Sequence, residues 1–127
     1  MRILITGGAG CLGSNLIEYW LPRGYLICAI DNFVTGNRYA LPNAPGLTMV
    51  KGSISDAGLV YNCFTRFKPT HVVHSAASYK DPNNWAEDTA TNILGTIHVA
   101  KAALEHGVRR FINFQTALCY GRPSQVP

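Results

Sequence analysis

The sequence predicts an α/β fold built on a parallel sheet, and three observations support this prediction. Short apolar runs alternate with segments of helical periodicity along the chain. The composition is 47% hydrophobic and only 14% charged, which is typical of a sheet covered by helices on both faces. A length of 127 residues is sufficient for one domain with its own core.

The expected elements follow from this alternation. Strands are expected at residues 2–6, 25–30, 47–51, 70–74 and 109–115, and helices at residues 12–21, 56–67 and 84–106. The longest helix carries a mostly apolar stripe that stops before Gly107, and residues 32–45 are the main irregular segment. Right-handed crossovers then predict a Rossmann-like, doubly wound sheet of five strands in the order 3-2-1-4-5, with a ligand crevice above strands 1 and 4.

A glycine-rich turn directly follows the first apolar run. Residues 6–13 read TGGAGCLG, and their spacing fits both Gly8-x-Gly10-x-x-Gly13 and the variant Gly7-x-x-Gly10-x-x-Gly13. A phosphate can lie against backbone N–H groups only where no Cβ intervenes, and the following helix adds unpaired donors and the positive end of its dipole. We therefore predict a dinucleotide site in which one glycine makes the tight turn, Gly10 admits the pyrophosphate and Gly13 lets the helix pack on the strand.

Asp31 stands at the end of the second apolar run, 18 positions after Gly13. A ribose-binding acid is expected at this point of a dinucleotide-binding unit. The alternative is a solvated aspartate that caps a turn. The glycine turn upstream favours the ribose-binding interpretation.

Charge and histidine placement argue against two other classes of site. The formal net charge is +4, but the basic residues are scattered, with no run longer than Arg109-Arg110. A nucleic-acid groove would gather such residues on one face, so no nucleic-acid partner is expected. The four histidines are dispersed, so no metal site is expected either.

Cysteine usage and the N-terminal residues indicate a cellular compartment. The cysteines show no C-x-x-C pairing, and reduced thiols are expected at Cys11, Cys28, Cys63 and Cys119. The first two residues lead straight into a strand, so no signal peptide is expected, and no apolar run approaches membrane-spanning length. We expect a cytoplasmic protein with no membrane partner.

Five motifs, in this order along the chain, carry a resemblance to a known family. They are Gly7-x-x-Gly10-x-x-Gly13, Asp31-Asn32-Phe33, His74-Ser75-Ala76-Ala77, Thr91-Asn92-Ile93-Leu94-Gly95-Thr96 and Phe114-Gln115-Thr116-Ala117-Leu118-Cys119-Tyr120-Gly121. With them, the chain resembles the extended short-chain dehydrogenases/reductases, and more narrowly their NAD-dependent nucleotide-sugar epimerase/dehydratase branch. The resemblance covers the whole chain and implies hydride transfer between a sugar hydroxyl and NAD.

The resemblance implies a cofactor site built from the glycine turn, the ends of strands 2 to 4 and the long helix. The implied cofactor-binding residues are Gly7, Gly10, Cys11, Leu12, Gly13, Asp31, Asn32, Phe33, Thr35, Gly36, Ser53, Ile54, Ser75, Ala76, Ala77, Lys80 and Asn92. In the family, a residue at the position of Thr116 hydrogen-bonds the sugar hydroxyl that is oxidised, which implies a catalytic role for this threonine. A threonine after a strand is otherwise an ordinary turn former.

Asp31 favours NAD over NADP. Its carboxylate would accept hydrogen bonds from the adenosine ribose hydroxyls, whereas a 2′-phosphate would bring two negative charges to ~4 Å, a repulsion of about 4 kcal/mol per charge pair at an effective dielectric near 20. Arg38 is close enough in sequence to neutralise such a phosphate, so NADP stays open as an alternative.

Two residues next to the expected crevice have ordinary interpretations as well. By itself, His74 is expected to be a strand-end histidine bonded to the backbone, with no acid, base or metal role. Asn92 on a helix would normally face solvent. The resemblance instead implies that Asn92 lies on the cofactor side and supports the backbone of the active site.

The chain departs from the family pattern at two points. Where the family often has an aspartate for the adenine amino group, residues 52–56 read GSISD, so Ser53 is left to bond the adenine edge more weakly and Asp56 is expected to cap the next helix. No tyrosine is followed four residues later by lysine, although the family's catalysis uses a Tyr-x-x-x-Lys pair as general base. We expect residues 1–127 to be the NAD-binding domain, an incomplete form of the family fold that lacks the sugar-binding domain and is inactive alone.

Three functions remain open from the sequence. The first is the NAD-binding part of a nucleotide-sugar epimerase or dehydratase, which would meet its nucleotide-sugar substrate only in the complete enzyme. The second is a non-catalytic module that binds or senses NAD, and the third is a structural domain in which the glycine turn is only a turn. For the first, apolar surface left uncovered beside the fifth strand is expected to promote a homodimer.

Overall fold

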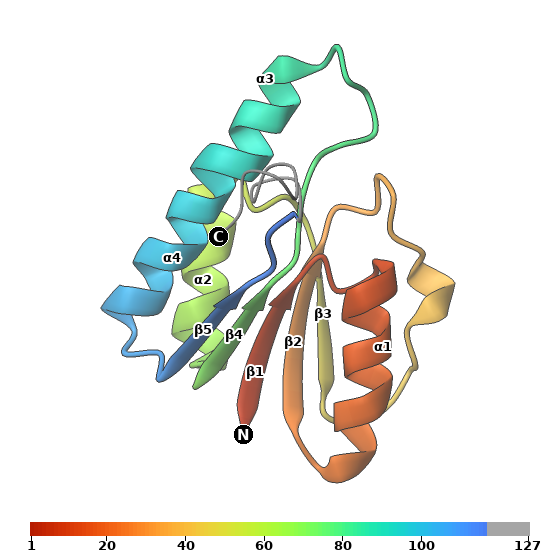
Figure 1. Ribbon diagram of the computed structural model, residues 1–127. Coiled ribbons are helices and arrows are strands. Elements are labelled where there is room, and N and C mark those ends of the chain that lie inside the picture. Colours follow the sequence, from red (N-terminus) through yellow and green to blue (C-terminus); the bar gives the residue numbers. More distant parts are fainter. Residues whose placement is uncertain (117–127) are drawn as a thin grey trace, which may run out of the picture.

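In the computed structural model, which describes residues 1–116, five parallel strands form one sheet in the order β3-β2-β1-β4-β5 (Figure 1). The strands are β1 (Arg2–Thr6), β2 (Leu26–Asp31), β3 (Leu47–Lys51), β4 (His71–His74) and β5 (Arg110–Asn113). The predicted fold class and strand order are confirmed. The fifth strand is shorter than expected, because its pairing with β4 ends where His74 lies beside Asn113.

Three helical segments connect the strands. They are α1 (Cys11–Trp20), α2 (Ala57–Phe67) and a continuous helix made of α3 (Trp85–Asp88), the π-helical segment η3 (Thr89–Gly95) and α4 (Thr96–Glu105). Short 3-10 turns, η1 (Leu21–Arg23) and η2 (Arg38–Ala40), lie before and after β2. The long helix runs almost as predicted, but its middle is a π segment, a local widening that is frequent at functional sites.

The helices cover the two faces of the sheet separately (Figure 1). Strand residues alternate between the faces: Leu4 belongs to the core under α2 and α4, whereas Ile3 and Ile5 belong to the core under α1. In α2, Phe64 is buried in the first core, and in α1, Ile17 is buried in the second. The two cores hold β1 rigidly, and the carboxyl end of β1 is where the glycine turn begins.

The start of α2 follows the sequence prediction. Asp56 is its N-cap, and its Oδ1 accepts the backbone N–H of Leu59 at 2.9 Å. The helix stops at Lys68, which adopts a left-handed conformation with φ 51° just before Pro69. The carboxylate of Asp56 is therefore used to cap α2. Ser53 is the other predicted polar side chain close to the end of β3.

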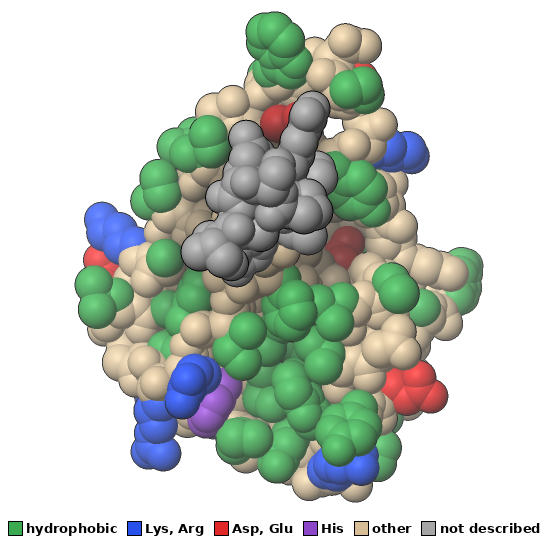
Figure 2. All heavy atoms as spheres, in the orientation of Figure 1, with side chains coloured by type: hydrophobic (Ala, Val, Ile, Leu, Met, Phe, Trp, Pro, Cys, Tyr) green, Lys and Arg blue, Asp and Glu red, His purple; other side chains and the backbone are tan. Residues whose placement is uncertain are grey.

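Among residues 1–116, no helix covers part of the sheet on the side of α1 (Figure 1). Figure 2 shows hydrophobic side chains gathered on this face, over β1, β4 and β5. Ile112 on β5 and Phe114 just after it are both exposed. Within residues 1–116, no helix is long and apolar enough to cross a membrane.

Candidate functional site

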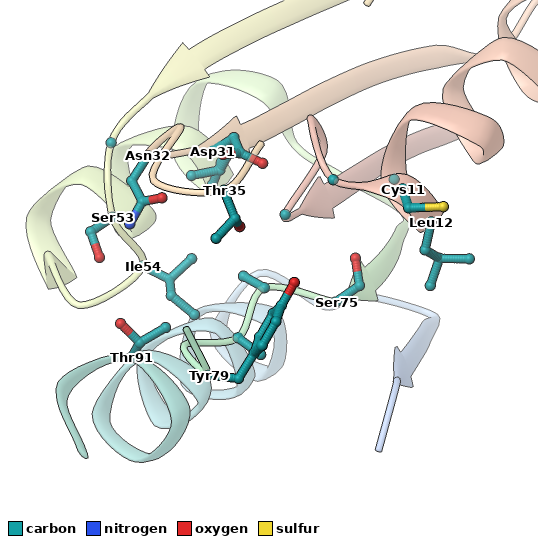
Figure 3. Close-up of a pocket in the computed structure, with 17 residues that line it drawn as sticks. Cys11, Leu12, Asp31, Asn32, Thr35, Ser53, Ile54, Ser75, Tyr79 and Thr91 are labelled. Carbon is teal, nitrogen blue, oxygen red and sulfur yellow. The ribbon is translucent and has the colours of Figure 1, made fainter. Parts of the chain in front are cut away.

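A cleft of about 260 Å³ opens at the carboxyl ends of the strands, at the point where the winding of the sheet reverses between β1 and β4. Figure 3 shows Cys11 and Leu12 at one end of this cleft and Ser53 and Thr91 at the other. The cleft is lined by Gly7, Gly10, Cys11, Leu12, Gly13, Ile30, Asp31, Asn32, Thr35, Gly52, Ser53, Ile54, Ser75, Ala76, Ala77, Tyr79 and Thr91.

The glycine turn owes its shape to two close approaches of the backbone. Gly7 has φ +69°, which L side chains rarely adopt, and a Cβ there would lie 2.9 Å from the backbone nitrogen of Ala76. A Cβ on Gly13 would overlap the Gly7 carbonyl oxygen and lie 2.6 Å from the Cα of Gly8. The first glycine therefore makes the turn, and the third lets α1 pack directly on it.

The N-terminus of α1 points its backbone donors at the cleft. Gly10 is the N-cap, no side chain among the described residues caps it, and the first turn contains no acidic residue. A Cβ on Gly10 would meet only the Gly7 carbonyl oxygen, at 3.2 Å. Cys11, Leu12 and Gly13 line the cleft directly after this cap. Uncapped N–H groups and the positive end of the helix dipole suit this turn to binding an anion.

Asp31 lies beside the turn, at the end of β2. The residue is only 7% exposed, and its two carboxylate oxygens accept backbone N–H groups: Oδ2 from Ala9 at 2.8 Å and Oδ1 from Phe33 at 2.8 Å. These bonds fix the carboxylate against the glycine turn. Because each carboxylate oxygen has a further lone pair, Asp31 can still accept hydroxyl donors from a ligand.

Phe33 and Gly36, two predicted cofactor residues, support Asp31 and are not among the residues that line the cleft. The ring of Phe33 packs against the core under α1, and only its backbone N–H reaches the carboxylate. A Cβ on Gly36 would lie 2.7 Å from Oδ1 of Asp31 and 2.9 Å from Cβ of Ala9. In the loop after β2, Phe33 and Gly36 therefore pack against the Asp31 carboxylate outside the cleft, whereas Asn32 and Thr35 line the cleft.

On the opposite wall, a chain of hydrogen bonds runs through His74. Its Nδ1 lies 2.7 Å from Oγ1 of Thr6, and its Nε2 lies 2.9 Å from Oγ1 of Thr96. Thr6 Oγ1 also accepts the backbone N–H groups of Ser75 and Ala76, both at 3.2 Å. The bonds of His74 thus go to two threonine hydroxyls, which corrects the expectation of a backbone partner.

These bonds determine which imidazole nitrogen carries the proton. The Thr96 hydroxyl donates to the carbonyl of Asn92 at 2.8 Å, so it can only accept from His74, and Nε2 is the protonated nitrogen. Burial lowers the pKa of His74 below its ordinary value of 6.5, which keeps the ring neutral and leaves Nδ1 to accept the Thr6 proton. The histidine therefore links β1, β4 and the long helix.

Asn92 fixes the loop that follows β4. Its Oδ1 accepts the backbone N–H of Ser78 and its Nδ2 donates to the Ser78 carbonyl, both at 2.8 Å. Asn92 is not among the residues that line the cleft; its amide holds the loop, and the adjacent Thr91 lines the cleft. Likewise Tyr79, and not the predicted Lys80, contributes to the cleft wall, although this tyrosine is 74% exposed.

The remaining predicted residues line the cleft or lie at the edge of the described chain. Ser53 and Ile54 line the cleft beyond β3, and the Ser53 hydroxyl is 2.8 Å from that of Ser55. Thr116 is exposed, three residues after the end of β5. The rest of its motif, residues 117–121, lies outside the described residues, as does Cys119.

Sequence reasoning missed four residues of the cleft wall, namely Ile30, Gly52, Tyr79 and Thr91. Each is the immediate neighbour of a residue that was predicted. The motif positions and these four residues belong to the same segments, and local backbone geometry decides which side of each segment faces the cleft.

Comparison with known proteins identifies the family. The model of the NAD dependent epimerase/dehydratase family matches residues 3–127. The chain belongs to this family. The UDP-glucose 4-epimerase of Halalkalibacterium halodurans is 35% identical over 133 residues, which is 100% of this chain and 38% of that protein.

Solved structures of the family have the same architecture. The Bordetella bronchiseptica enzyme WbmG in complex with NAD matches with a TM-score of 0.96 and 68% identity, over 100% of this chain and 41% of that one. The UDP-glucose 4-epimerase of Thermus thermophilus, also in complex with NAD, matches with a TM-score of 0.80 and 34% identity, over 87% and 36% of the two chains. The chain thus spans about two-fifths of the length of these relatives.

Proposed function

We propose that this chain binds NAD in the cleft above β1 and β4 and forms the NAD-binding part of a nucleotide-sugar epimerase or dehydratase. The observation that carries the proposal is the juxtaposition of an uncapped helix N-terminus with the fixed carboxylate of Asp31 in one cleft. The first suits a pyrophosphate and the second suits a ribose diol. The structures of WbmG with NAD, and with NAD and UDP, support this choice of ligands.

The residues of the cleft would hold the cofactor along its length. The glycine turn would receive the pyrophosphate, and Asp31 would accept the adenosine ribose hydroxyls. Ser53 and Thr91, at the far end of the cleft, would border the adenine, and the small residues 75–77 leave room for the chain of the dinucleotide against the backbone. When bound, NAD supplies the hydride acceptor for oxidation of a sugar hydroxyl.

Titration with NAD and NADH by calorimetry tests the binding site. Gly10→Val adds a branched side chain between the turn and the pyrophosphate, so we expect at least about a tenfold loss of affinity. Gly58→Val, in the first turn of α2 and away from the cleft, is the matched control and should bind as the unaltered chain does. Absence of binding by the unaltered chain at millimolar cofactor would refute the proposal.

The preference for NAD over NADP depends on the charge of Asp31. The repulsion between its carboxylate and a 2′-phosphate at ~4 Å amounts to about 4 kcal/mol at an effective dielectric near 20, and Arg38 is not among the residues that line the cleft to offset it. We expect Asp31→Asn to narrow the gap between the two affinities, while Asp81→Asn, which alters an exposed aspartate bonded to the Asn83 N–H, leaves it unchanged. Equal affinity of the unaltered chain for both cofactors would contradict this.

Catalysis requires more than the cofactor site. We propose that Thr116 bonds the reacting sugar hydroxyl in the complete enzyme, and residues 1–127 contain no Tyr-x-x-x-Lys pair to act as general base. The purified chain of 127 residues should therefore give no turnover with UDP- or dTDP-sugars. Measurable epimerisation or NADH formation would disprove this part of the proposal.

We also propose a homodimer formed through exposed apolar surface beside β5. Ile112 on β5 is paired with Val73, whose side chain belongs to the core on the side of α1, and both Ile112 and Phe114 are exposed. This surface can meet its own copy across a two-fold axis. In sedimentation experiments, Ile112→Asp should give a monomer, and the matched variant Ile97→Asp on α4, which also alters an exposed isoleucine, should not; the reverse result would move the interface to the helix.

A further inference from the structure

A second groove lies between the helix α2 and the edge strand β3. Its volume is about 620 Å³, which is larger than that of the cleft above β1 and β4 and typical of a ligand site. Its walls include Thr48 and Val50 of β3, the cap residue Asp56, and Leu59, Asn62 and Arg66 of α2. None of the described residues lines both the groove and the cleft, so the groove is a separate feature of the surface.

The outer edge of β3 is open. Within residues 1–116, β3 is the last strand on its side of the sheet and pairs only with β2 (Figure 1). This pairing begins where the carbonyl of Gly46 accepts the N–H of Ile27 at 2.8 Å. Because every second residue of a parallel strand bonds the same neighbour, the N–H and C=O groups of Met49 and Lys51 point away from β2. No group of the described chain bonds them, and an extended segment can pair with such an edge.

Two opposite charges stand at the two ends of the groove. The helix α2 runs back along the strands, so Asp56 lies near the carboxyl end of β3 and Arg66 near its amino end. They are ten positions apart, which is about 15 Å at the rise of an α-helix. Oδ1 of Asp56 caps the helix, but its other oxygen and the Arg66 guanidinium have no hydrogen-bond or ion-pair partner in the described part of the chain. Between the two charges, the groove is lined by the apolar side chains of Val50 and Leu59.

These features match the dimensions of an extended peptide. Alternate side chains of a strand point to the same face, and its first and fifth residues are about 13 Å apart. We propose that the groove binds an extended segment of a partner protein, which adds a strand to β3 and places an acidic, an aliphatic and a basic side chain in the groove at every second position. The backbone of the segment bonds Met49 and Lys51. Its acidic side chain pairs with Arg66 and its basic side chain with Asp56, while the aliphatic side chain covers Val50.

The charges favour a partner protein over a second copy of this chain. β3 reads LTMVK over residues 47–51 and contains no acidic residue. A copy of β3 added at this edge, in either direction and with either face towards the groove, would therefore leave Arg66 unpaired. A segment with an acidic residue at one end satisfies Arg66 as well as the open backbone of the edge.

Fluorescence anisotropy with labelled peptides tests the groove in the purified chain. The peptides Glu-Thr-Val-Thr-Lys and Lys-Thr-Val-Thr-Glu, with blocked ends, carry the proposed pattern in the two directions of pairing. Thr-Glu-Val-Lys-Thr is the matched control, since it has the same composition but places both charges on the face opposite the valine. We expect one of the two patterned peptides to bind at least about tenfold more tightly than the control. A smaller preference, or no binding up to about 1 mM peptide, would overturn the proposal.

A charge reversal tests the role of Arg66. Arg66→Glu should weaken binding of the better peptide at least about tenfold, and a peptide with lysine in place of its glutamate should restore it. Arg38→Glu, which alters an exposed arginine in η2 outside the groove, is the matched control for net charge and should bind as the unaltered chain does. Equal losses in the two variants, or no rescue by the lysine peptide, would show that Arg66 does not receive the segment and would overturn the assignment.

Hydrogen exchange shows whether the segment pairs with the edge. Saturating peptide should slow exchange of the Met49 and Lys51 amides at least about tenfold, while the Val50 amide, which already bonds β2, stays protected. Unchanged exchange at Met49 would mean that the peptide adds no strand, which would overturn the proposed mode of binding. Protection of Met49 that rises with protein concentration in the absence of peptide would identify a second copy as the occupant and would also overturn the proposal.

Discussion

The two walls of the cleft above β1 and β4 are built by different means. On the wall formed by the glycine turn and β2, backbone atoms pack against each other, and the side chain of Asp31 is bonded to backbone N–H groups. On the wall formed by β4 and the long helix, side chains bond to one another and to the loop, through His74, Thr96 and Asn92. Steric exclusion therefore shapes the first wall, whereas a polar network shapes the second.

This difference predicts how each wall fails when it is altered. A clash between a new Cβ and backbone atoms cannot be relieved by rotating a side chain, so substitutions in the first wall are costly. A hydrogen bond that is lost in the second wall costs less where water can replace the missing partner. The loss of unfolding free energy should therefore be largest where a new side chain meets buried backbone atoms and smallest where an exposed hydrogen bond is lost.

The largest effect is expected for Gly13→Ala. Its Cβ would overlap the Gly7 carbonyl oxygen and lie 2.6 Å from the Cα of Gly8, so α1 has to move away from the turn. We expect the free energy of unfolding in urea to fall by about 3 kcal/mol, together with loss of NAD binding. Gly10→Ala, whose Cβ would meet a single atom at 3.2 Å, should lose less than about 1 kcal/mol. Equal losses for the two variants would show that close packing does not govern this wall.

An intermediate effect is expected for His74→Gln, which breaks the chain from Thr6 to Thr96. The unfolding free energy should fall by about 1–3 kcal/mol at neutral pH, because buried partners lose their hydrogen bonds. His71→Gln, on the same strand but half-buried, is the matched control and should cost less. A loss for His74→Gln no larger than that for His71→Gln would mean that the network does not stabilise the wall.

His74 also predicts the direction of a pH dependence. Burial lowers its folded-state pKa below 6.5, so between the two values the unfolded chain binds more protons than the folded one. Stability should therefore decrease as the pH falls from about 6.5 towards the folded pKa, by at most about 1.4 kcal/mol per pH unit from this residue. Urea titrations across this range should show the decrease diminished in His74→Gln and retained in His71→Gln; an identical slope in all three proteins would exclude His74 as its source.

The smallest effect is expected for Asn92→Ala. Both of its hydrogen bonds to Ser78 are exposed to solvent, so water replaces them and the loss should be about 1 kcal/mol. Asn15→Ala, which removes an exposed amide bonded to the Cys11 carbonyl, is the control for loss of a single bond. Hydrogen exchange of the Ser78 amide should increase in Asn92→Ala and not in Asn15→Ala, and unchanged exchange would mean that the loop is held by other groups.

Sequence reasoning was most successful for the first wall. The spacing of Gly7, Gly10 and Gly13 and the distance to Asp31 are local properties of one strand-turn-helix-strand unit, and the structure brings these residues together as predicted. In the second wall, residue numbers do not reveal the partners. His74 bonds residues 68 positions before it and 22 after it, and periodicity does not indicate such contacts.

By itself, the sequence determined the parallel five-stranded sheet, its strand order and the position of the glycine turn. These depend on local alternation, glycine spacing and the fixed handedness of crossovers, all of which can be read along the chain. Only the tertiary structure decided which neighbouring residue lines the cleft, namely Thr91 and not Asn92, and Tyr79 and not Lys80. It also decided which distant groups pair, as His74 does with Thr6 and Thr96. Side-chain direction and long-range pairing depend on how separate elements pack, and only the folded chain brings those elements together.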